Sequence, residues 1–174
     1  LAEQRYRRVI TSSYRFSKKD YTVADLPRFA ACLQATNDAL MLHEGIVGLR
    51  KLLSSSDNPP IQDVIDANFV NKIIELAKQS KYPYLQMEAV WIITNITSGT
   101  SSQCQTVVDK GAIPILIGLL SSPMQDTVEH VVWALANIAG DTHFNRDSIT
   151  KYGGLAELIR VVNTYQHSNH NIFK

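Results

Sequence analysis

The feature that most constrains the fold of this chain is a unit that occurs twice, 42 residues apart. Trp91-Ile92-Ile93-Thr94-Asn95 recurs as Trp133-Ala134-Leu135-Ala136-Asn137. Residues four apart lie about one turn from each other on one face of an α-helix, so each unit presents an indole ring beside a carboxamide. We therefore predict two long helices that play equivalent parts in the fold.

A second landmark keeps the same period. Gly111-Ala112-Ile113-Pro114 recurs 42 residues later as Gly153-Gly154-Leu155-Ala156, and the phase reaches back to Asn68-Phe69-Val70-Asn71, where the glycine and proline are replaced. A period near 42 is typical of helical solenoids. We expect each repeat to contain a short helix, a second helix that begins at the glycine, and a long third helix that carries Trp and Asn. The predicted fold class is all-α, a stack of helices and not a compact globule.

The period also predicts where the repeats begin and end. We expect a basic N-terminal arm at residues 1–20, a leading partial repeat at 21–57, repeats at 58–100 and 101–142, and an incomplete repeat at 143–174.

Both ends of the chain differ from the complete repeats. In the leading repeat Val47 and Lys51 stand where the later repeats have Trp and Asn, as expected of a terminal unit. The arm is either a solvated tail or a basic segment that mimics a ligand and enters a groove. Because the chain stops inside what should be its last long helix, we expect either a longer array or an open end that pairs with another molecule.

The composition excludes several classes of protein. The 174 residues are 45% hydrophobic, enough to bury a continuous core, and 17 basic residues against 16 acidic ones provide no overall field for nucleic acid or a membrane surface. Cys32 and Cys104 form no CxxC pair, which fits a reducing compartment. No apolar run approaches the roughly 20 residues that span a bilayer. We therefore predict a soluble intracellular protein whose recognition of charge is local.

The residues after the two Asn-bearing helices suggest what is recognised. Ser98-Gly99-Thr100 and Gly140-Asp141-Thr142 follow them, at helix ends where unsatisfied carbonyls and the macrodipole favour a cation. Asp141 adds a full negative charge. An indole would shelter the aliphatic stem of a lysine or arginine, the Asn amide would hold a peptide backbone, and the helix end would receive the cation.

A single tryptophan on an amphipathic helix is more often part of the core than exposed to solvent. Here other residues already supply the apolar stripe of each helix: Val90, Ile93 and Ile96 in the first, and Val132, Leu135 and Ile138 in the second. We therefore expect both indole rings to face solvent on the hollow side of the stack.

These residues resemble the armadillo repeats of the importin alpha family. The resemblance rests on residues 49–53, 58–61, 85–91, 94–96, 98–100, 111–115, 120–123, 132–135 and 137–141. It implies a right-handed armadillo-repeat superhelix (α-solenoid) of about three to four repeats over residues 21–174, truncated at its C-terminal end. It also implies a nuclear import adaptor, in cytoplasm and nucleus, that binds lysine/arginine-rich nuclear localisation signals in extended conformation along a concave Trp–Asn groove.

The resemblance assigns a signal-binding site residue by residue. Its members would be Trp91, Asn95, Ser98, Gly99, Thr100, Cys104, His130, Trp133, Asn137, Gly140 and Asp141. The deepest lysine pocket would combine the Gly99 carbonyl, Thr100 and Asp141. Cys104 stands where the family commonly has Thr, so we expect lysine to be held less tightly. His130 stands where the family often has Gln, so we expect binding to be sensitive to pH. Ser55 stands where the family often has a basic residue.

Other functions are compatible with parts of the sequence. A catenin-type armadillo scaffold would share the fold but use a more basic groove for acidic partners. Importin beta binds a basic N-terminal domain in the family, and residues 1–20 do not match that domain. His167-Ser168-Asn169-His170 lacks a nearby acid or thiol ligand and is expected to be a solvated turn instead of a metal site. With no His close to Cys104 in the sequence and no phosphate-binding glycine loop, we expect neither cofactor nor catalysis.

Overall fold

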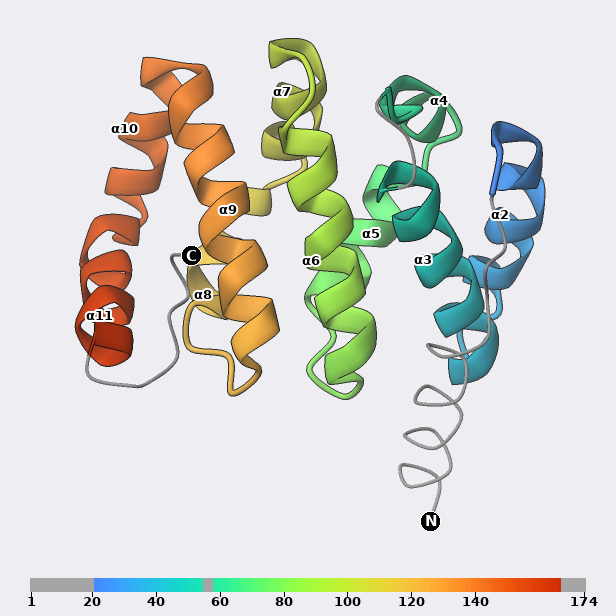
Figure 1. Ribbon diagram of the computed structural model, residues 1–174, viewed down its shortest axis with the longest axis horizontal. Helices are drawn as coiled ribbons and strands as arrows, with labels where there is room; N and C mark the ends of the chain where they lie inside the picture. Colours follow the sequence, from blue (N-terminus) through green and yellow to red (C-terminus); the bar gives the residue numbers. More distant parts are fainter. Residues whose placement is uncertain (1–20, 55–57, 167–174) are drawn as a thin grey trace. The chain divides into compact units, whose positions relative to one another are not determined.

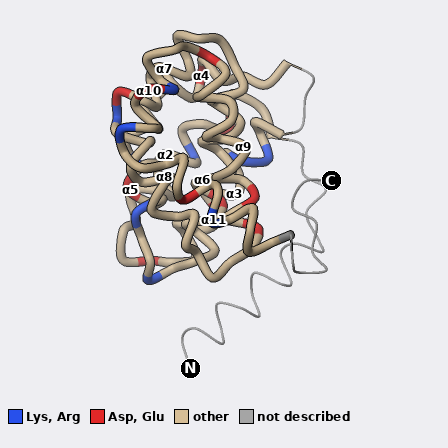
Figure 2. The backbone as a smooth tube through the Cα atoms, turned by 90° about the vertical axis from the view of Figure 1, so that its left-hand side faces the viewer, with Lys and Arg blue, Asp and Glu red and all other residues tan. Residues whose placement is uncertain are grey.

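The computed structural model describes residues 21–54 and 58–166, and these contain helices and no strand. The predicted arm, Ser55, and the histidines at 167 and 170 lie outside this range. The chain forms two compact units, Leu1–Pro60 and Ile61–Lys174. None of the described helices is long and apolar enough to cross a membrane. Figure 2 shows lysine and arginine interspersed with aspartate and glutamate along the described backbone.

The first unit contains a short 3-10 helix, η1 (Val23–Asp25), and two α-helices, α2 (Leu26–Gln34) and α3 (Ala39–Ser54), that pack on each other. Pro27 lies in the first turn of α2, where its missing N–H has no intrahelical partner to lose. Phe29 of α2 is fully buried, and a Cβ at Gly48 would lie 2.2 Å from its ring. Glycine at this position therefore allows the two helices to approach closely.

The second unit contains two sets of three helices followed by a pair. They are α4 (Ile61–Asp66), α5 (Val70–Ala77) and α6 (Pro83–Thr97), then α7 (Ser101–Asp109), α8 (Ala112–Leu119) and α9 (Gln125–Asp141), then α10 (His143–Lys151) and α11 (Gly154–Gln166). The long helices α6 and α9 lie side by side, with α5 packed on α6 and α8 on α9 (Figure 1). The predicted order of a short, a second and a long helix is therefore observed twice.

The junction before the second helix of each set has one backbone conformation. Gly111 and Gly153 both have φ of 79°, and Asn68 has φ of 61°. These are left-handed values, which glycine adopts freely and which asparagine tolerates better than most residues. Asn68, which stands where the later repeats have glycine, therefore keeps the same left-handed backbone conformation.

The core of the second unit follows the predicted stripe with one correction. Val90, Ile93 and Ile96 of α6 are buried, but on α9 the buried valines are Val128 and Val131, and Val132 is only half-buried. Successive helical residues point about 100° apart. Position 132 lies at the edge of the face that α9 turns towards α6 and α8.

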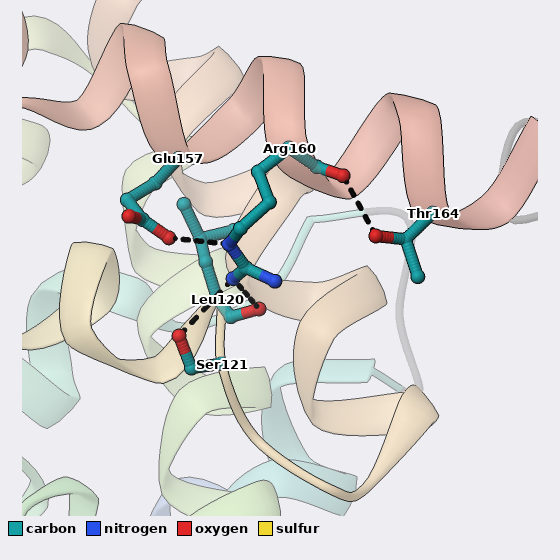
Figure 3. A network of polar contacts seen from close by, with 5 residues as sticks. All are labelled: Leu120, Ser121, Glu157, Arg160 and Thr164. Carbon is teal, nitrogen blue, oxygen red and sulfur yellow. Dashed lines mark hydrogen bonds and ion pairs between the residues drawn. The ribbon is translucent and has the colours of Figure 1, made fainter.

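Arg160 of α11 bonds the end of a neighbouring helix. Arg160 of α11 donates from Nη2 to the Leu120 carbonyl and to Ser121 Oγ, both at 3.1 Å, at the end of α8 (Figure 3). Glu157 Oε2 accepts from Arg160 Nε at 2.8 Å and holds the guanidinium in place. Such contacts satisfy helix-terminal carbonyls and complement the macrodipole.

Candidate functional site

The two tryptophans differ in exposure. Trp133 of α9 is 49% exposed, in agreement with the expectation that its ring faces solvent. Trp91 of α6 is half-buried, so the same expectation holds only in part. Neither ring is sealed in the core, because the apolar stripes of α6 and α9 are filled by aliphatic residues.

His130 accounts for part of the cover over Trp91. Its imidazole stacks on the Trp91 indole with ring centroids 4.4 Å apart and planes 25° apart. The same imidazole meets Trp133 edge to face, at 5.5 Å and 88°. His130 is only 8% exposed, and three aromatic rings form a continuous row across α6 and α9. The sequence placed His130 at the site but could not indicate this stacking, which depends on how two helices pack.

The Trp–Asn unit of α9 is bonded to that of α6. Asn137 Nδ2 lies 3.3 Å from the Thr94 carbonyl oxygen and 3.4 Å from Thr97 Oγ1. Thr94 Oγ1 lies 2.9 Å from the carbonyl oxygen of His130. Thr94 lies inside the recurring Trp-x-x-x-Asn unit, but nothing in the sequence indicated that it links the helices. The side-chain amide of Asn137 is thus oriented by α6.

The end of α6 is shaped by a cap on α7. Thr100 is the N-cap residue of α7: its Oγ1 accepts from the Gln103 N–H at 3.3 Å, and its own N–H donates to Gln103 Oε1 at 2.9 Å. Gln103 also donates to Gln62 Oε1 of α4 at 3.2 Å. A Cβ at Gly99 would lie 2.2 Å from Gln103 Oε1. The glycine therefore permits the chain to pass against this reciprocal cap.

Cys104 and Asp141, far apart in the sequence, lie together as the resemblance implied. Cys104 is 1% exposed, and burial, with the Asp141 carboxylate and a hydrogen bond to it, raises the pKa of the thiol to about 11. The thiol is therefore protonated at neutral pH and donates to Asp141. A hydrogen bond at this position survives the replacement of Thr by Cys, although a thiol is a weaker donor than a hydroxyl.

Asn145, which no sequence pattern indicated as a site residue, also orients Asp141. Its Nδ2 lies 3.3 Å from Asp141 Oδ2 and 3.5 Å from Gln105 Oε1, and the residue is buried. The only signal for it is its position four residues after Asp141, the spacing at which side chains meet on a helical turn.

The last turn of α9 already has a cation of its own. Arg146 Nη1 donates to the Ala139 carbonyl at 3.0 Å, because α10 begins directly after α9 and turns Arg146 back onto it. From the sequence, the ends of both α6 and α9 are expected to favour a ligand cation, with Asp141 adding negative charge at the end of α9. The structure adds a difference between them, because one carbonyl near the α9 terminus is bonded to the chain's own guanidinium.

The described residues bring together no group of three or more histidine, cysteine, aspartate or glutamate side chains that could hold a metal ion. The arrangement consists of aromatic faces, amides, an oriented carboxylate and helix ends. Groups of these kinds can contact an extended, positively charged ligand through shape, hydrogen bonds and charge.

Comparison with known proteins identifies the repeat and its relatives. The family model for the armadillo/beta-catenin-like repeat matches residues 57–98 and 100–140. Importin subunit alpha-1b of Oryza sativa subsp. japonica is 43% identical over 140 residues, and importin subunit alpha-2 of Arabidopsis thaliana is 41% identical over the same length. Each alignment covers 80% of this chain and 26% of the relative, so the chain spans about a quarter of these proteins.

A solved structure has the same fold. A designed armadillo repeat protein in complex with the peptide (KR)4 superposes with a TM-score of 0.74 at 28% identity, over 83% of this chain and 59% of that one. The fold and its repeats therefore define an armadillo-repeat protein. The similarity to importin alpha subunits identifies the family more narrowly: the chain carries an armadillo region of the importin alpha family. This confirms the predicted solenoid and the resemblance, and it agrees with the prediction of a non-enzymatic protein.

Proposed function

We propose that this armadillo region binds lysine/arginine-rich nuclear localisation signals of cargo proteins, in extended conformation, along the Trp–Asn surface of α6 and α9. In this proposal it serves a nuclear import adaptor that works in cytoplasm and nucleus. The observation that carries the proposal is the half-exposed indole of Trp133 on the same helix as Asn137 and Asp141. The (KR)4 complex of the designed neighbour supports a basic peptide as the ligand, and the names of the relatives support a part in import.

Each group has a part in the proposed binding. Trp133, and to a lesser degree Trp91, shelters the aliphatic stem of a basic side chain and attracts its cation. Asn137 uses its amide N–H groups on Thr94 and Thr97 of α6, so its Oδ1 is the atom that accepts a peptide N–H. Asn95 would contact the peptide from α6 in the equivalent position.

The carboxylate of Asp141 receives the ammonium group of a lysine near the Gly99 carbonyl and Thr100. Hydrogen bonds from Cys104 and Asn145 hold it in one orientation, and a carboxylate has about four acceptor sites, so two such bonds leave capacity for a cation. Ser98 Oγ donates to the Asn95 carbonyl at 2.7 Å and fixes the end of α6 next to this place. At the α9 end, beside Gly140, Arg146 disfavours a second ligand cation.

The spacing of the helices sets the register of the peptide. Packed helices lie roughly 8–10 Å apart, and an extended chain advances about 3.3 Å per residue, so the two indoles serve side chains two or three residues apart. Each exposed cation–π contact contributes about 0.5–1 kcal/mol, and each hydrogen bond nets about 1 kcal/mol. Useful affinity therefore needs several of these groups together.

Titration with a pair of peptides tests the proposal. A fluorescent lysine-rich peptide and a version with glutamate at every lysine are compared by anisotropy at low and high salt. The proposal expects binding of the lysine-rich peptide, weaker at high salt because exposed charges are screened, and no comparable binding of the acidic peptide. Preference for the acidic peptide would instead indicate the catenin-type scaffold and overturn the proposal.

A further inference from the structure

The imidazole of His130 occupies the interval between the two indole rings of the proposed peptide site. It lies 4.4 Å from the Trp91 ring, centroid to centroid and nearly parallel to it, and 5.5 Å from the Trp133 ring, nearly perpendicular to it. These are the separations of rings in direct contact. One face of Trp91 is therefore covered by a side chain of the same protein.

We propose that His130 makes this interval accept only a small side chain of the bound peptide, so that it selects against lysine and arginine at that one position. The inference rests on the proposed function and concerns which register of basic residues the site takes. An aliphatic stem inserted between the Trp91 and His130 rings would need about 3.5–4.0 Å of carbon–carbon separation from each ring. Rings stacked at 4.4 Å leave no such space.

The imidazole is also held where it is. His130 is 8% exposed, and its main-chain carbonyl accepts from Thr94 Oγ1 at 2.9 Å, which fixes this turn of α9 against α6. A rotation away from the interval would break the contacts with both indoles at once. A peptide side chain that displaced the imidazole would have to replace two ring contacts.

The two indoles consequently have different tasks. Trp133 is 49% exposed, and its ring is nearly perpendicular to that of His130. It therefore keeps exposed surface for the stem of a long basic side chain. Trp91 is half-buried and gives one face to the imidazole. The preferred ligand has basic residues on either side of the interval and a glycine, alanine or serine over it.

A position-by-position peptide scan tests this selection. A lysine-rich peptide that binds the parent is prepared with glycine, alanine or lysine at each position in turn, and dissociation constants are measured for the parent, His130→Ala and His130→Ser. His143→Ala is the matched control, because His143 is an exposed histidine on α10 that contacts Phe144. Circular dichroism and thermal melting establish that each variant is folded.

In the parent we expect one position at which alanine binds about fivefold or more tighter than lysine, the size of one lost ring contact. The preference should disappear or reverse in both His130 variants and persist in His143→Ala. Lysine equal to or better than alanine at every position of the parent overturns the inference. So does the same preference in a folded His130 variant. Failure of every peptide to bind would instead contradict the proposed function itself.

Discussion

Thr94 Oγ1 lies 2.9 Å from the carbonyl oxygen of His130 and 3.0 Å from that of Val90, so one hydroxyl bonds both to its own helix and to the neighbouring one. The carbonyl of Thr94 in turn accepts from Asn137 Nδ2 at 3.3 Å. Thr94 lies between Trp91 and Asn95 in the sequence. A single residue of the first Trp–Asn unit therefore orients the second unit.

Replacement of Thr94 by valine should destabilise the protein by about 1–2 kcal/mol. Valine keeps the volume and the β-branch, but it leaves the buried carbonyl of His130 without this donor. Urea unfolding followed by circular dichroism measures the change. Thr106→Val is the matched control, because Thr106 Oγ1 bonds only to the Ser102 carbonyl on the same helix. Equal losses in the two variants would show that the contact between helices adds nothing.

Replacement by alanine should lower the stability of the protein at Gly111, just before α8, and raise it at Gly118, within α8. Gly111 has φ of 79°, and a Cβ there would meet nothing within 4 Å, so the cost of alanine is purely conformational, about 1 kcal/mol. Gly118 lies within α8, also in open space, and alanine there should stabilise the protein by about 0.5 kcal/mol. Thermal melting of the two variants measures both effects. A lower melting temperature for Gly118→Ala would contradict the account.

The buried thiol of Cys104 should make stability fall at high pH. The pKa of the thiol is raised from its ordinary value of 9.0 to about 11, mainly by burial and to a smaller extent by Asp141. An acid whose pKa is raised by folding contributes stability that is complete below about pH 9 and is lost as pH rises through about 11. The difference in unfolding free energy between the parent and Cys104→Ala should therefore shrink across this window.

Cys32, whose pKa burial also raises, is present in both proteins and cancels in this comparison. Urea unfolding at pH 8, 9, 10 and 11 provides the measurement. A difference that stays constant from pH 8 to pH 11 would mean that the thiol does not titrate differently in the folded and unfolded chains.

The sequence period predicted the elements that depend on local rules. The order of the helices, the junction at Gly111 and its equivalent at Asn68 all follow from backbone preferences that repeat every 42 or 43 residues. The position of Cys104 beside Asp141 came from the resemblance. The helix and junction features depend on residues along one helix or at one turn, whereas the contact between Cys104 and Asp141 joins α7 to α9.

What the sequence could not predict depends on packing between helices. His130 against Trp91, Thr94 against α9, and Arg146 on the end of α9 join residues whose relation is set by how neighbouring helices pack. Val131, and not the predicted Val132, is buried in the core, because the packing of α9 determines which face is buried and successive side chains point about 100° apart. Periodicity indicates which face is buried but not which partner it meets.

The central claim is that the Trp–Asn surface of α6 and α9 binds basic peptides, and paired substitution of its rings tests it most directly. A lysine-rich peptide is titrated into the parent, Trp91→Ala/Trp133→Ala and Tyr152→Ala, whose substituted aromatic ring is exposed on another helix end. We predict that the double substitution weakens binding by at least about 2 kcal/mol, roughly 30-fold in Kd, and that Tyr152→Ala leaves it unchanged. An unchanged Kd in the folded double variant would contradict the account.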